Sequence, residues 1–491
     1  MIGNRYFFAA FFAIIAFLAP STMDAATKLH VDVNGDGEVN IADINAVVDY
    51  ILYGHGGPIV DEGQNYLSAK DYGAVGDGET DDTEALEALF NDAFNMKKAV
   101  FFDPGTYIIR RSLLLRTGME IYGEDATLKK RDAVTTTLDE PTVKDQTYIE
   151  VKSAEGFNVG DQFFIADPAG ANQCTYCIVT AVEGNRISFY NIISDHQSNF
   201  PGCIKNYDSG LKVSTSFALL RSWSTRYECD GVFIHDLTLD GNRNSSEARE
   251  WSNSCIHIDS YYPGGYTGNT GIDYRQVQRD LQVRNVVIKN SPCDAISDQG
   301  EGGLIVRDCV IQNSAMHGVH VGTKYNAAVI ANNTMTGNGS VGSGVFFCQE
   351  VYNVIVDNNK ITSFNHGCSD EEFGTAARYV TIRNNEFQSI KSYVFDFLKA
   401  RSNFHCTGLQ ISNNRINNLK APLFSGDYLD NVILSDNVIS SVTTTPSSLI
   451  KMEDSKNIII YGNKLPAGVE IAEPIAATDT ENLIENSNSW N

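Results

Sequence analysis

The sequence is short of basic residues, of proline and of long apolar segments. It has 37 Lys and Arg against 61 Asp and Glu, a formal net charge of −24, and 12 prolines in 491 residues. A strongly acidic chain repels phosphate backbones and anionic lipid, which disfavours nucleic acids and membrane surfaces as partners. No segment reaches the about 18 consecutive apolar residues of a transmembrane helix, so the sequence predicts no membrane span.

The longest apolar segment lies within residues 1–25. It runs from Phe7 to Leu18, and a small residue follows at Ala25. This segment has the length of a signal-peptide h-region and is too short to span a bilayer. We therefore expect a signal peptide over 1–25 and a protein secreted by bacterial export. The leader contains no cysteine, which disfavours a lipoprotein anchor.

The 10 cysteines do not form a compact framework, because their spacing is irregular over more than 200 residues. Cys174 and Cys177 form a lone Cys-x-x-Cys pair, without the second pair or the nearby histidines of a zinc site. We expect two thiols or a local disulfide there. Most of the others fall inside predicted strands, where cysteine acts as a small hydrophobic residue.

A glycine-centred acidic loop follows the leader. Its oxygen-bearing residues have the spacing of an EF-hand calcium loop, and Gly37 allows the sharp bend that gathers them. The predicted Ca²⁺ ligands are Asp32, Asn34, Asp36, Glu38 and Asp43. An amphipathic helix over 44–52 completes the unit, so we expect a calcium module over 26–54 and a linker over 55–68.

The loop and helix resemble one repeat of a dockerin, a module built from two such units. The resemblance implies a cohesin-like scaffold as partner. Only one unit is visible in this sequence. The alternative is a calcium-stabilised spacer between the export signal and the rest of the protein.

Residues 69–126 open the large domain. A glycine- and aspartate-rich stretch precedes a helix with apolar residues at 85, 86, 89, 90, 93 and 94, capped by Asp82 or its neighbour. The strand at 99–107 reads Ala-Val-Phe-Phe-Asp-Pro-Gly-Thr-Tyr. This stretch resembles the opening of the pectate-lyase-like superfamily of right-handed parallel β-helices. The resemblance implies an N-terminal cap and first coils over 69–126.

Short apolar strands that end in Asn or Asp recur through residues 223–491. The terminal, or landmark, residues are Asp236, Asn285, Asp308, Asn332, Asn358, Asn384, Asn413 and Asp436, with Gly462 at the same place in the last strand. After a first gap of 49 residues, they follow one another at intervals of 23 to 29. A period of about 25 fits one solenoid turn of three strands. Asn and Asp can adopt the left-handed conformation and stack in ladders. The sequence therefore predicts an all-β fold, a right-handed parallel β-helix.

Residues 127–222 break this repeat. They contain longer alternating segments at 148–151, 160–165, 177–182 and 186–189, with a turn at 183–185. We expect an inserted antiparallel β-subdomain packed against the early coils.

A second strand in each coil carries the candidate site. Alternation turns His257, Ser297 and His320 outward, one above another at about 4.8 Å. The candidate catalytic residues are Asp259, Asp294, Asp298, His257, His317 and His320. Carboxylates and imidazoles at this spacing suit acid/base chemistry on glycosidic bonds. The alternative is a solvated polar face without chemistry.

Two families resemble this part of the chain. His317–Gly322 resembles the "H-G-I-S-I-G" strand of polygalacturonase-type glycoside hydrolases, whose "D-D-C-V-A-I" falls at 291–296, with Ser and Pro at the paired aspartates. Residues 293–301 resemble the "Y-G-F-D-P-H-E" strand of mannuronan C5-epimerases and related lyases. That resemblance implies Asp298 as the family aspartate, with its histidine supplied by His317 or His320.

These observations favour a glycoside hydrolase acting in a groove of the β-helix. One of Asp294 and Asp298 would protonate the leaving oxygen, the other or Asp259 would activate water, and His317 would orient the sugar. The alternatives are a lyase or C5-epimerase on a uronic-acid polymer and a non-catalytic glycan-binding solenoid.

The charge pattern bears on these alternatives. The net charge of −24 opposes an anionic substrate. A local basic stretch near the first coils opposes this trend: Arg110, Arg111, Arg116, Lys129, Lys130 and Arg131. No cofactor other than Ca²⁺ is expected.

Overall fold

The computed structural model describes residues 65–166, 174–191, 206–222, 229–243, 253–258, 279–300, 302–322, 325–338, 341–348, 350–370, 376–397 and 405–490. The predicted signal peptide, the calcium loop and helix and most of the predicted linker lie outside these residues. No described helix is both long and apolar enough to cross a membrane.

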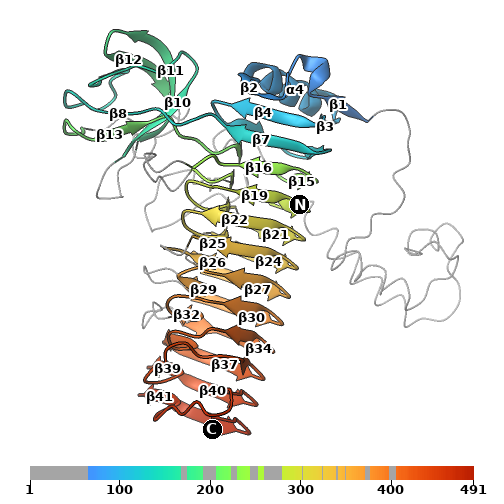
Figure 1. The fold of residues 1–491 in the computed structure, drawn as a ribbon, viewed down its shortest axis with the longest axis vertical. Helices are drawn as coiled ribbons and strands as arrows, with labels where there is room; N and C mark the ends of the chain where they lie inside the picture. Colours follow the sequence, from blue (N-terminus) through green and yellow to red (C-terminus); the bar gives the residue numbers. More distant parts are fainter. Residues whose placement is uncertain are drawn as a thin grey trace, which may run out of the picture. The chain divides into compact units, whose positions relative to one another are not determined.

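The described chain forms a right-handed parallel β-solenoid with three long sheets (Figure 1). Sheet A contains, in spatial order, β1 (Tyr66–Ser68), β3 (Ala99–Phe102), β6 (Glu120–Gly123), β15 (Phe233–His235), β18 (Gln282–Arg284), β21 (Gly302–Arg307), β24 (Tyr325–Ala331), β27 (Glu350–Asp357), β30 (Ala376–Arg383), β33 (Cys406–Thr407) with β34 (Gln410–Ser412), β37 (Leu429–Ser435), β40 (Lys456–Tyr461) and β42 (Glu481–Asn486). The predicted linker therefore ends earlier than expected, since Tyr66–Ser68 pairs with β3.

The other two sheets complete each coil. Sheet B contains β2 (Asp77–Asp81), β4 (Gly105–Ile109), β7 (Ala126–Lys130), β16 (Thr238–Asp240), β19 (Val287–Lys289), β22 (Val310–Ser314), β25 (Thr334–Gly337), β28 (Lys360–Thr362), β31 (Glu386–Gln388), β35 (Arg415–Asn417) and β38 (Val438–Ile439). Sheet C contains β5 (Leu113–Leu115), β14 (Leu220–Ser222), β17 (Ile256–Ile258), β20 (Ile296–Asp298), β23 (Val319–Val321), β26 (Ser343–Phe347), β29 (His366–Asp370), β32 (Phe395–Phe397), β36 (Phe424–Asp427), β39 (Ile450–Glu453) and β41 (Ile475–Thr478).

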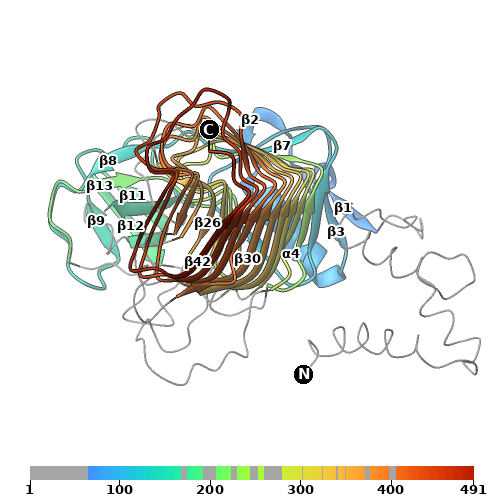
Figure 2. The same cartoon turned by 90° about the horizontal axis from the view of Figure 1, so that it is seen from below.

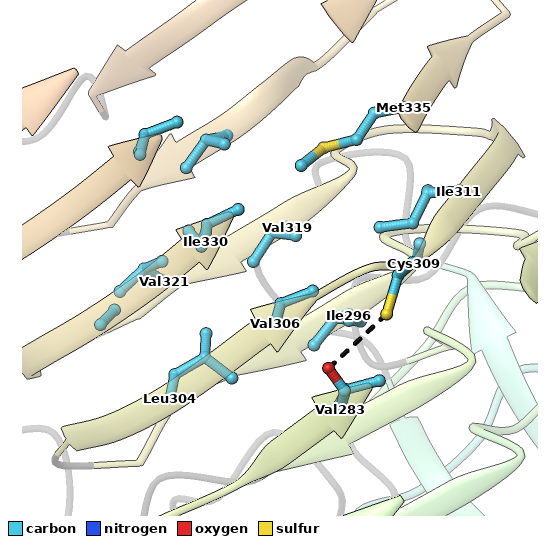
Figure 3. Packing of buried hydrophobic residues seen from close by; sticks show 14 of the residues in the cluster. Val283, Ile296, Leu304, Val306, Cys309, Ile311, Val319, Val321, Ile330 and Met335 are labelled. Atoms are coloured by element: carbon cyan, nitrogen blue, oxygen red, sulfur yellow. Dashed lines mark hydrogen bonds between the residues drawn. The ribbon is translucent and has the colours of Figure 1, made fainter. Parts of the chain in front are cut away.

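The core fills the interior of the coils. Because side chains alternate along a strand, every second residue of each strand points inward. Val283, Val306 and Ile330 pair in register on successive coils of sheet A and are fully buried (Figure 3). The prediction that most cysteines replace small core residues is confirmed at eight described positions, all buried: Cys177, Cys229, Cys255, Cys293, Cys309, Cys348, Cys368 and Cys406.

Two asparagine-rich features shape the turn between sheets A and B. The predicted left-handed landmarks are confirmed: from Asp236 to Asp436 their φ angles lie between 50° and 58°. A second, buried ladder runs one residue further along the chain and was not predicted. Its members are Asn333, Asn359, Asn385, Asn414, Asn437 and Asn463. From Asn359 onward, each side-chain oxygen accepts from the backbone and side-chain N–H groups of the preceding member, as Asn385 does from Asn359 at 2.8 and 3.0 Å.

The predicted helix closes the N-terminal end of the solenoid. It is α4 (Thr83–Met96), and it follows the short 3-10 helix η1 (Lys70–Tyr72). Leu86, Leu89 and Phe90 of α4 are buried in the solenoid core. Asp82 stands at the predicted cap position, but its carboxylate accepts the backbone N–H groups of Val75 and Gly76 instead of capping the helix.

The predicted antiparallel insertion is present as a separate sheet D (Figures 1 and 2). Its strands are β8 (Thr135–Thr137), β13 (Lys212–Ser214), β10 (Gln162–Ala166), β11 (Cys174–Glu183), β12 (Arg186–Asn191) and β9 (Tyr148–Glu150). The sheet is shorter than the predicted 127–222, since β7 and β14 at its two ends belong to sheets B and C. Sheet D has a hydrophobic core of its own, which includes Phe163, Ile187 and Val213.

Candidate active site

The predicted outward column is confirmed by the register of sheet C. His257 pairs with Ser297 across β17 and β20, and Ser297 pairs with His320 across β20 and β23. Arg221 of β14 precedes His257 in the same column. The column continues through Phe346, Ser369, Asp396, Ser425 and Lys451. The chemistry-bearing face therefore extends over more coils than the three that the sequence indicated.

Asp294 and His320 form the central contact of this face. Asp294 lies in the turn before β20, and its Oδ2 is 2.8 Å from Nδ1 of His320 one coil further on. Its other oxygen accepts the backbone N–H of His317 at 3.0 Å. The Asp294 side chain is 3% exposed. Solvent is thus nearly excluded from a carboxylate that is held by two hydrogen bonds.

The surroundings of Asp294 favour its charged form. Burial alone would raise its pKa, because a charge is poorly solvated in the interior. When the two imidazoles are protonated, the charge of His317, the hydrogen bond from His320 and the charge of His320 outweigh that effect, so the pKa of Asp294 is lowered. An ionised Asp294 accepts a proton-bearing Nδ1 of His320, which fixes the ring's tautomer and orientation.

The second nitrogen of His320 meets a glutamine. Nε2 of His320 lies 2.9 Å from Nε2 of Gln299, and the same amide donates to Oγ of Ser297 at 3.2 Å. With its proton on Nδ1, the imidazole presents a lone pair at Nε2, which accepts from the Gln299 amide. A ring with a carboxylate at Nδ1 and a lone pair at Nε2 has the geometry that a general base requires.

His317 is held in the opposite tautomer. Its Nδ1 accepts the backbone N–H of Ser343 at 3.0 Å, so the neutral ring carries its proton on Nε2. The ring stacks on Phe346 with centroids 4.0 Å apart and an interplanar angle of 11°. The His317 and His320 ring centroids are 5.6 Å apart. One imidazole thus offers a donor and its neighbour an acceptor on the same face.

The structure separates the two aspartates that the sequence paired. Asp298 aligns with Ile258 and Val321, which are inward positions, and its Oδ1 accepts the backbone N–H of Gly300 at 2.9 Å. Asp294 contacts His320 on the outer side instead. The register therefore does not bring the two carboxylates to one face. Among the other candidates, His257 is fully buried in its outward column, and Asp259 lies outside the described residues.

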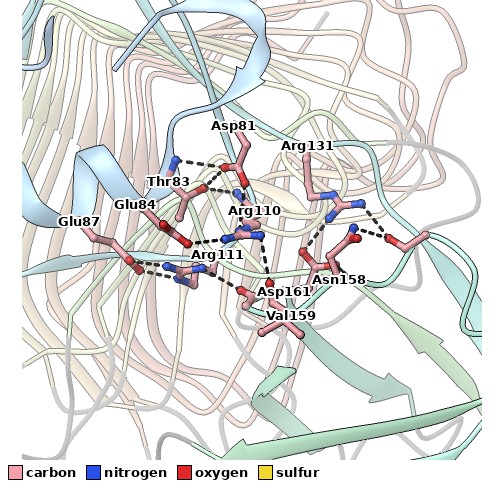
Figure 4. Close-up of polar contacts among 12 residues, drawn as sticks. Asp81, Thr83, Glu84, Glu87, Arg110, Arg111, Arg131, Asn158, Val159 and Asp161 are labelled. Atoms are coloured by element: carbon pink, nitrogen blue, oxygen red, sulfur yellow. Dashed lines mark hydrogen bonds and ion pairs between the residues drawn. The ribbon is translucent and has the colours of Figure 1, made fainter. Parts of the chain in front are cut away.

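The basic stretch near the first coils has a structural partner. Arg131 pairs with Asp161 of the insertion at 2.7 Å, and Arg111 pairs with Glu87 of α4 at 2.5 Å (Figure 4). Arg110 lies 3.1 Å from Asp81. These arginines join the insertion and the helix to the solenoid, which is a different role from the anionic-substrate contact that the charge pattern indicated.

Sequence reasoning missed a second histidine–aspartate contact. Nδ1 of His366 on β29 lies 3.2 Å from Oδ2 of Asp396 on β32. The available signal was the Phe395-Asp396-Phe397 pattern, in which one polar residue stands between two inward phenylalanines. In the described part of the chain no group of three or more His, Cys, Asp and Glu side chains is arranged to hold a metal ion. The predicted calcium loop lies outside the described residues.

Two family models match parts of the chain. Residues 66–169 match the model described as "Rhamnogalacturonase A/epimerase, pectate lyase-like", and residues 270–407 match the model for a right-handed β-helix region. A glucan 1,3-beta-glucosidase of Cochliobolus carbonum is 37% identical over 60 residues, which cover 12% of this chain and 8% of that protein. The mannuronan C5-epimerase AlgE1 of Azotobacter vinelandii is 26% identical over 149 residues, 26% of this chain and 10% of that protein.

Among solved structures, PfbA, a surface adhesin of Streptococcus pneumoniae, has a TM-score of 0.54 at 14% identity. The alignment covers 86% of this chain and 89% of PfbA. The chain spans only 5% to 10% of the lengths of the curated relatives that it matches. The chain is therefore similar to pectate-lyase-like proteins over residues 66–169 and to right-handed β-helix proteins over residues 270–407.

Proposed function

We propose that this protein is a secreted carbohydrate-active enzyme, a polysaccharide hydrolase whose catalytic centre is the Asp294–His320 pair on the outer face of sheet C. The observation that carries the proposal is the buried hydrogen bond between the two side chains, which orients His320 as a base. The names of the relatives add support, since they include a glucosidase and an epimerase of polysaccharides.

In the proposed reaction, His320 carries the proton and His317 assists as a hydrogen-bond donor. Nε2 of His320 takes a proton from water as that water attacks the sugar, Asp294 stabilises the imidazolium that forms, and the imidazolium then gives this proton to the departing oxygen. Nε2–H of His317 donates a hydrogen bond to the leaving oxygen without losing its proton, and its stack on Phe346 holds the ring in place. Gln299 must release Nε2 of His320 when substrate binds.

A lyase or C5-epimerase is the second candidate, and the match to AlgE1 favours it. In that reaction His320 would abstract the proton at C5 of a uronate. Such a step needs a positive group to stabilise the charge that develops on the substrate carboxylate. Asp294 contacts His317 and His320, and neither of these is a Lys or Arg side chain that would supply a permanent positive charge. These contacts favour hydrolysis over the alternative.

The proposal includes an extracellular location and the N-terminal calcium loop. The similarity to a surface adhesin supports the location. Asp32–Asp43 would bind Ca²⁺, and a cohesin-like scaffold is the partner that the dockerin resemblance implies. Calorimetric titration of the metal-free protein with Ca²⁺ would test the loop independently of catalysis. We expect Asp36→Ala to abolish the Ca²⁺ binding that the wild-type protein shows.

The test of catalysis is a screen of the purified protein on neutral and uronic-acid polysaccharides. New reducing ends and ultraviolet absorbance are followed together, since elimination alone produces an absorbing unsaturated uronate. We expect reducing ends without absorbance, and a loss of roughly 10²- to 10⁴-fold in turnover for Asp294→Asn and His320→Gln. Asp236→Asn is the matched control, because Asp236 also contacts a histidine but lies in the turn after β15 of sheet A. Unchanged turnover in Asp294→Asn would refute the proposed centre.

A further inference from the structure

The C-terminal coils of sheet C carry a second polar cluster, three coils beyond His320. Asp396 of β32 pairs in register with Ser425 of β36, and Asp427 lies two residues further along the same strand. Alternation turns Ser425 and Asp427 to the outer face, while Phe424 is buried inside. We call Asp396, Ser425 and Asp427 the distal cluster.

The hydroxyl of Ser425 is a buried hydrogen-bonding group that a ligand could satisfy. The residue is 1% exposed, and its hydroxyl has no hydrogen-bond partner in the described part of the chain. Buried polar groups are nearly always paired in native proteins, and an exception calls for an explanation. The hydroxyl stands in the outward column between Asp396 and Lys451, so it faces the position where a ligand on this face would lie.

The charge around the distal cluster restricts the chemistry of that ligand. Burial together with the charges of Glu453, Asp454 and Asp396 raises the pKa of Asp427 to about 6, so its carboxylate resists a further negative charge. Glu453 is the in-register partner of Asp427 on the next coil. Among the described residues, the basic side chains beside the cluster are Lys451 in the outward column and His366, whose Nδ1 is 3.2 Å from Asp396.

A carboxylate accepts hydrogen bonds and donates none once it is ionised, so this cluster suits a ligand rich in hydroxyl donors. A uronate or phosphate would meet several carboxylates and would be repelled. A divalent cation is disfavoured, because no three His, Cys, Asp or Glu side chains among the described residues form a metal site. The aromatic ring of Tyr393, parallel to that of His366 at an interplanar angle of 14°, adds an apolar surface beside the cluster.

We infer that the distal cluster binds the hydroxyl groups of an uncharged sugar residue in the same polysaccharide chain that reaches the Asp294–His320 centre. This inference rests on the proposed function and deepens it by naming the substrate class. At about 4.8 Å per coil, Asp396 and Ser425 lie about 14–19 Å from His320 along the solenoid. A polymer along sheet C would contact both places, whereas a short oligosaccharide at the catalytic centre would not reach the cluster.

The binding test is affinity electrophoresis of the full chain at about pH 7.5, above the pKa of Asp427. Native gels contain laminarin, galactomannan or xyloglucan as uncharged probes, and alginate as the anionic probe. We expect at least one uncharged polymer to retard the protein, with affinity reduced about tenfold or more in Asp427→Asn and Ser425→Leu. Asp430→Asn is the matched control, because Asp430 lies on the next strand, in sheet A, and pairs with Lys456.

Three results would overturn the inference: no retardation by any uncharged probe, retardation by alginate alone, or unchanged affinity in Asp427→Asn. Asp427→Asn is nearly isosteric and its site is partly exposed, so it carries the test if Ser425→Leu lowers the melting temperature. Kinetic measurements distinguish a failure of the distal-cluster inference from a failure of the proposed catalytic centre. For Asp427→Asn we expect KM to rise for the long polymer and kcat to stay unchanged, while Asp294→Asn loses kcat and still binds the gel-borne polymer.

Discussion

Asp294 and Asp427 are carboxylates on the same face of sheet C, yet their surroundings move their pKa values in opposite directions. Burial disfavours the charge on both. At Asp294 the neighbouring His317 and His320 overcome that effect, whereas at Asp427 the neighbours are carboxylates that add to it. The type of neighbour, more than the depth of burial, therefore decides which of the two carboxylates stays ionised in acid.

Asp427→Asn should stabilise the folded protein at neutral pH. The pKa of Asp427 is raised from 3.8 to about 6 on folding, so the folded state holds the extra proton between these values. Stability then falls as the pH rises through this window, and the cost is complete above about pH 6. An asparagine side chain carries no charge, so the substitution removes this cost. Because the group is partly exposed, we expect a gain on the order of 1 kcal/mol at about pH 7.5 that disappears by about pH 4.

Denaturant unfolding of wild type and Asp427→Asn across this pH range measures the gain. Asp430→Asn provides the reference for loss of a nearby carboxylate. A gain that stays constant from about pH 4 to 7.5 would contradict the assigned cause.

His235 should also make the folded protein less stable as the pH rises, in this case because a stabilising charge is lost. Burial lowers the pKa of its imidazole, but hydrogen bonds to Glu120 and Asp236 and their charges prevail and raise the pKa above 6.5. Its contribution to stability is complete below the unfolded pKa and is lost as the pH rises through the folded pKa. We expect His235→Gln to destabilise the protein more at about pH 5.5 than at about pH 9, as measured by thermal unfolding. An equal loss at both pH values would show that packing against Tyr122 and Phe233 dominates.

These residue-level properties were beyond sequence reasoning. The partners of His320 lie 21 and 26 residues away, and the glutamine that meets its Nε2 carries no motif. Alternation predicted correctly that His257, Ser297 and His320 share a column. It could not predict that Asp294, which precedes its strand in a turn, would join them while Asp298 at the strand's end would not.

At the scale of the element, the turn between sheets A and B depends on two asparagines with different roles. The landmark Asn384 adopts the left-handed conformation, with φ at 58°, and its side chain reaches Asp357 on the preceding coil. The next residue, Asn385, is buried, and its side-chain oxygen accepts the backbone N–H of Asn359. Conformation explains the first asparagine, and hydrogen-bond satisfaction explains the second.

We expect Asn385→Ala to destabilise the solenoid by about 2–4 kcal/mol, because it leaves the backbone N–H of Asn359 buried without its acceptor and removes the side-chain donor to the carbonyl of Val356. Asn384→Gly is the matched control. Glycine adopts the left-handed conformation without strain, so its cost should stay below about 1 kcal/mol. Chemical denaturation of both variants checks the contrast, and equal losses would show that the backbone conformation alone sustains the turn.

The strands and the landmark asparagines were predictable because each coil repeats the same local pattern. The buried ladder was not, although its asparagines are visible in the sequence. Two adjacent asparagines at each turn give no local sign of which one enters the core. That choice follows from the packing of one coil on the next.

At the scale of the molecule, sheet D is attached to the solenoid by arginines of the first coils. Arg131 pairs with Asp161, whose side chain is fully buried, and Arg111 donates to the carbonyl of Gly160. Ser112 also donates to the side chain of Gln162 at 3.1 Å. A buried carboxylate that loses its cationic partner is strongly destabilising, by about 3–5 kcal/mol.

Arg131→Met should therefore loosen the insertion and leave the solenoid intact. We expect faster proteolytic cleavage within residues 135–214 and little change in the unfolding of the remaining coils. Arg186→Met is the matched control, since Arg186 forms a more exposed pair with Glu150 within the same sheet. Limited proteolysis followed by mass spectrometry locates the cuts. Equal cleavage rates in the two variants would show that other contacts hold the insertion.

The β-helix, its period, the N-terminal helix, the antiparallel insertion and the outward column of sheet C could be predicted from the sequence, because each depends on local periodicity or on alternation along a strand. The Asp294–His320 pair, the inward position of Asp298, the second pair at His366 and Asp396, and the role of the arginines became visible only in the folded chain. These features join side chains from different coils or from separate sheets. Their geometry depends on how the turns place residues of neighbouring coils, about 4.8 Å apart, relative to one another. Local sequence patterns do not contain this information, because the residues concerned are distant along the chain.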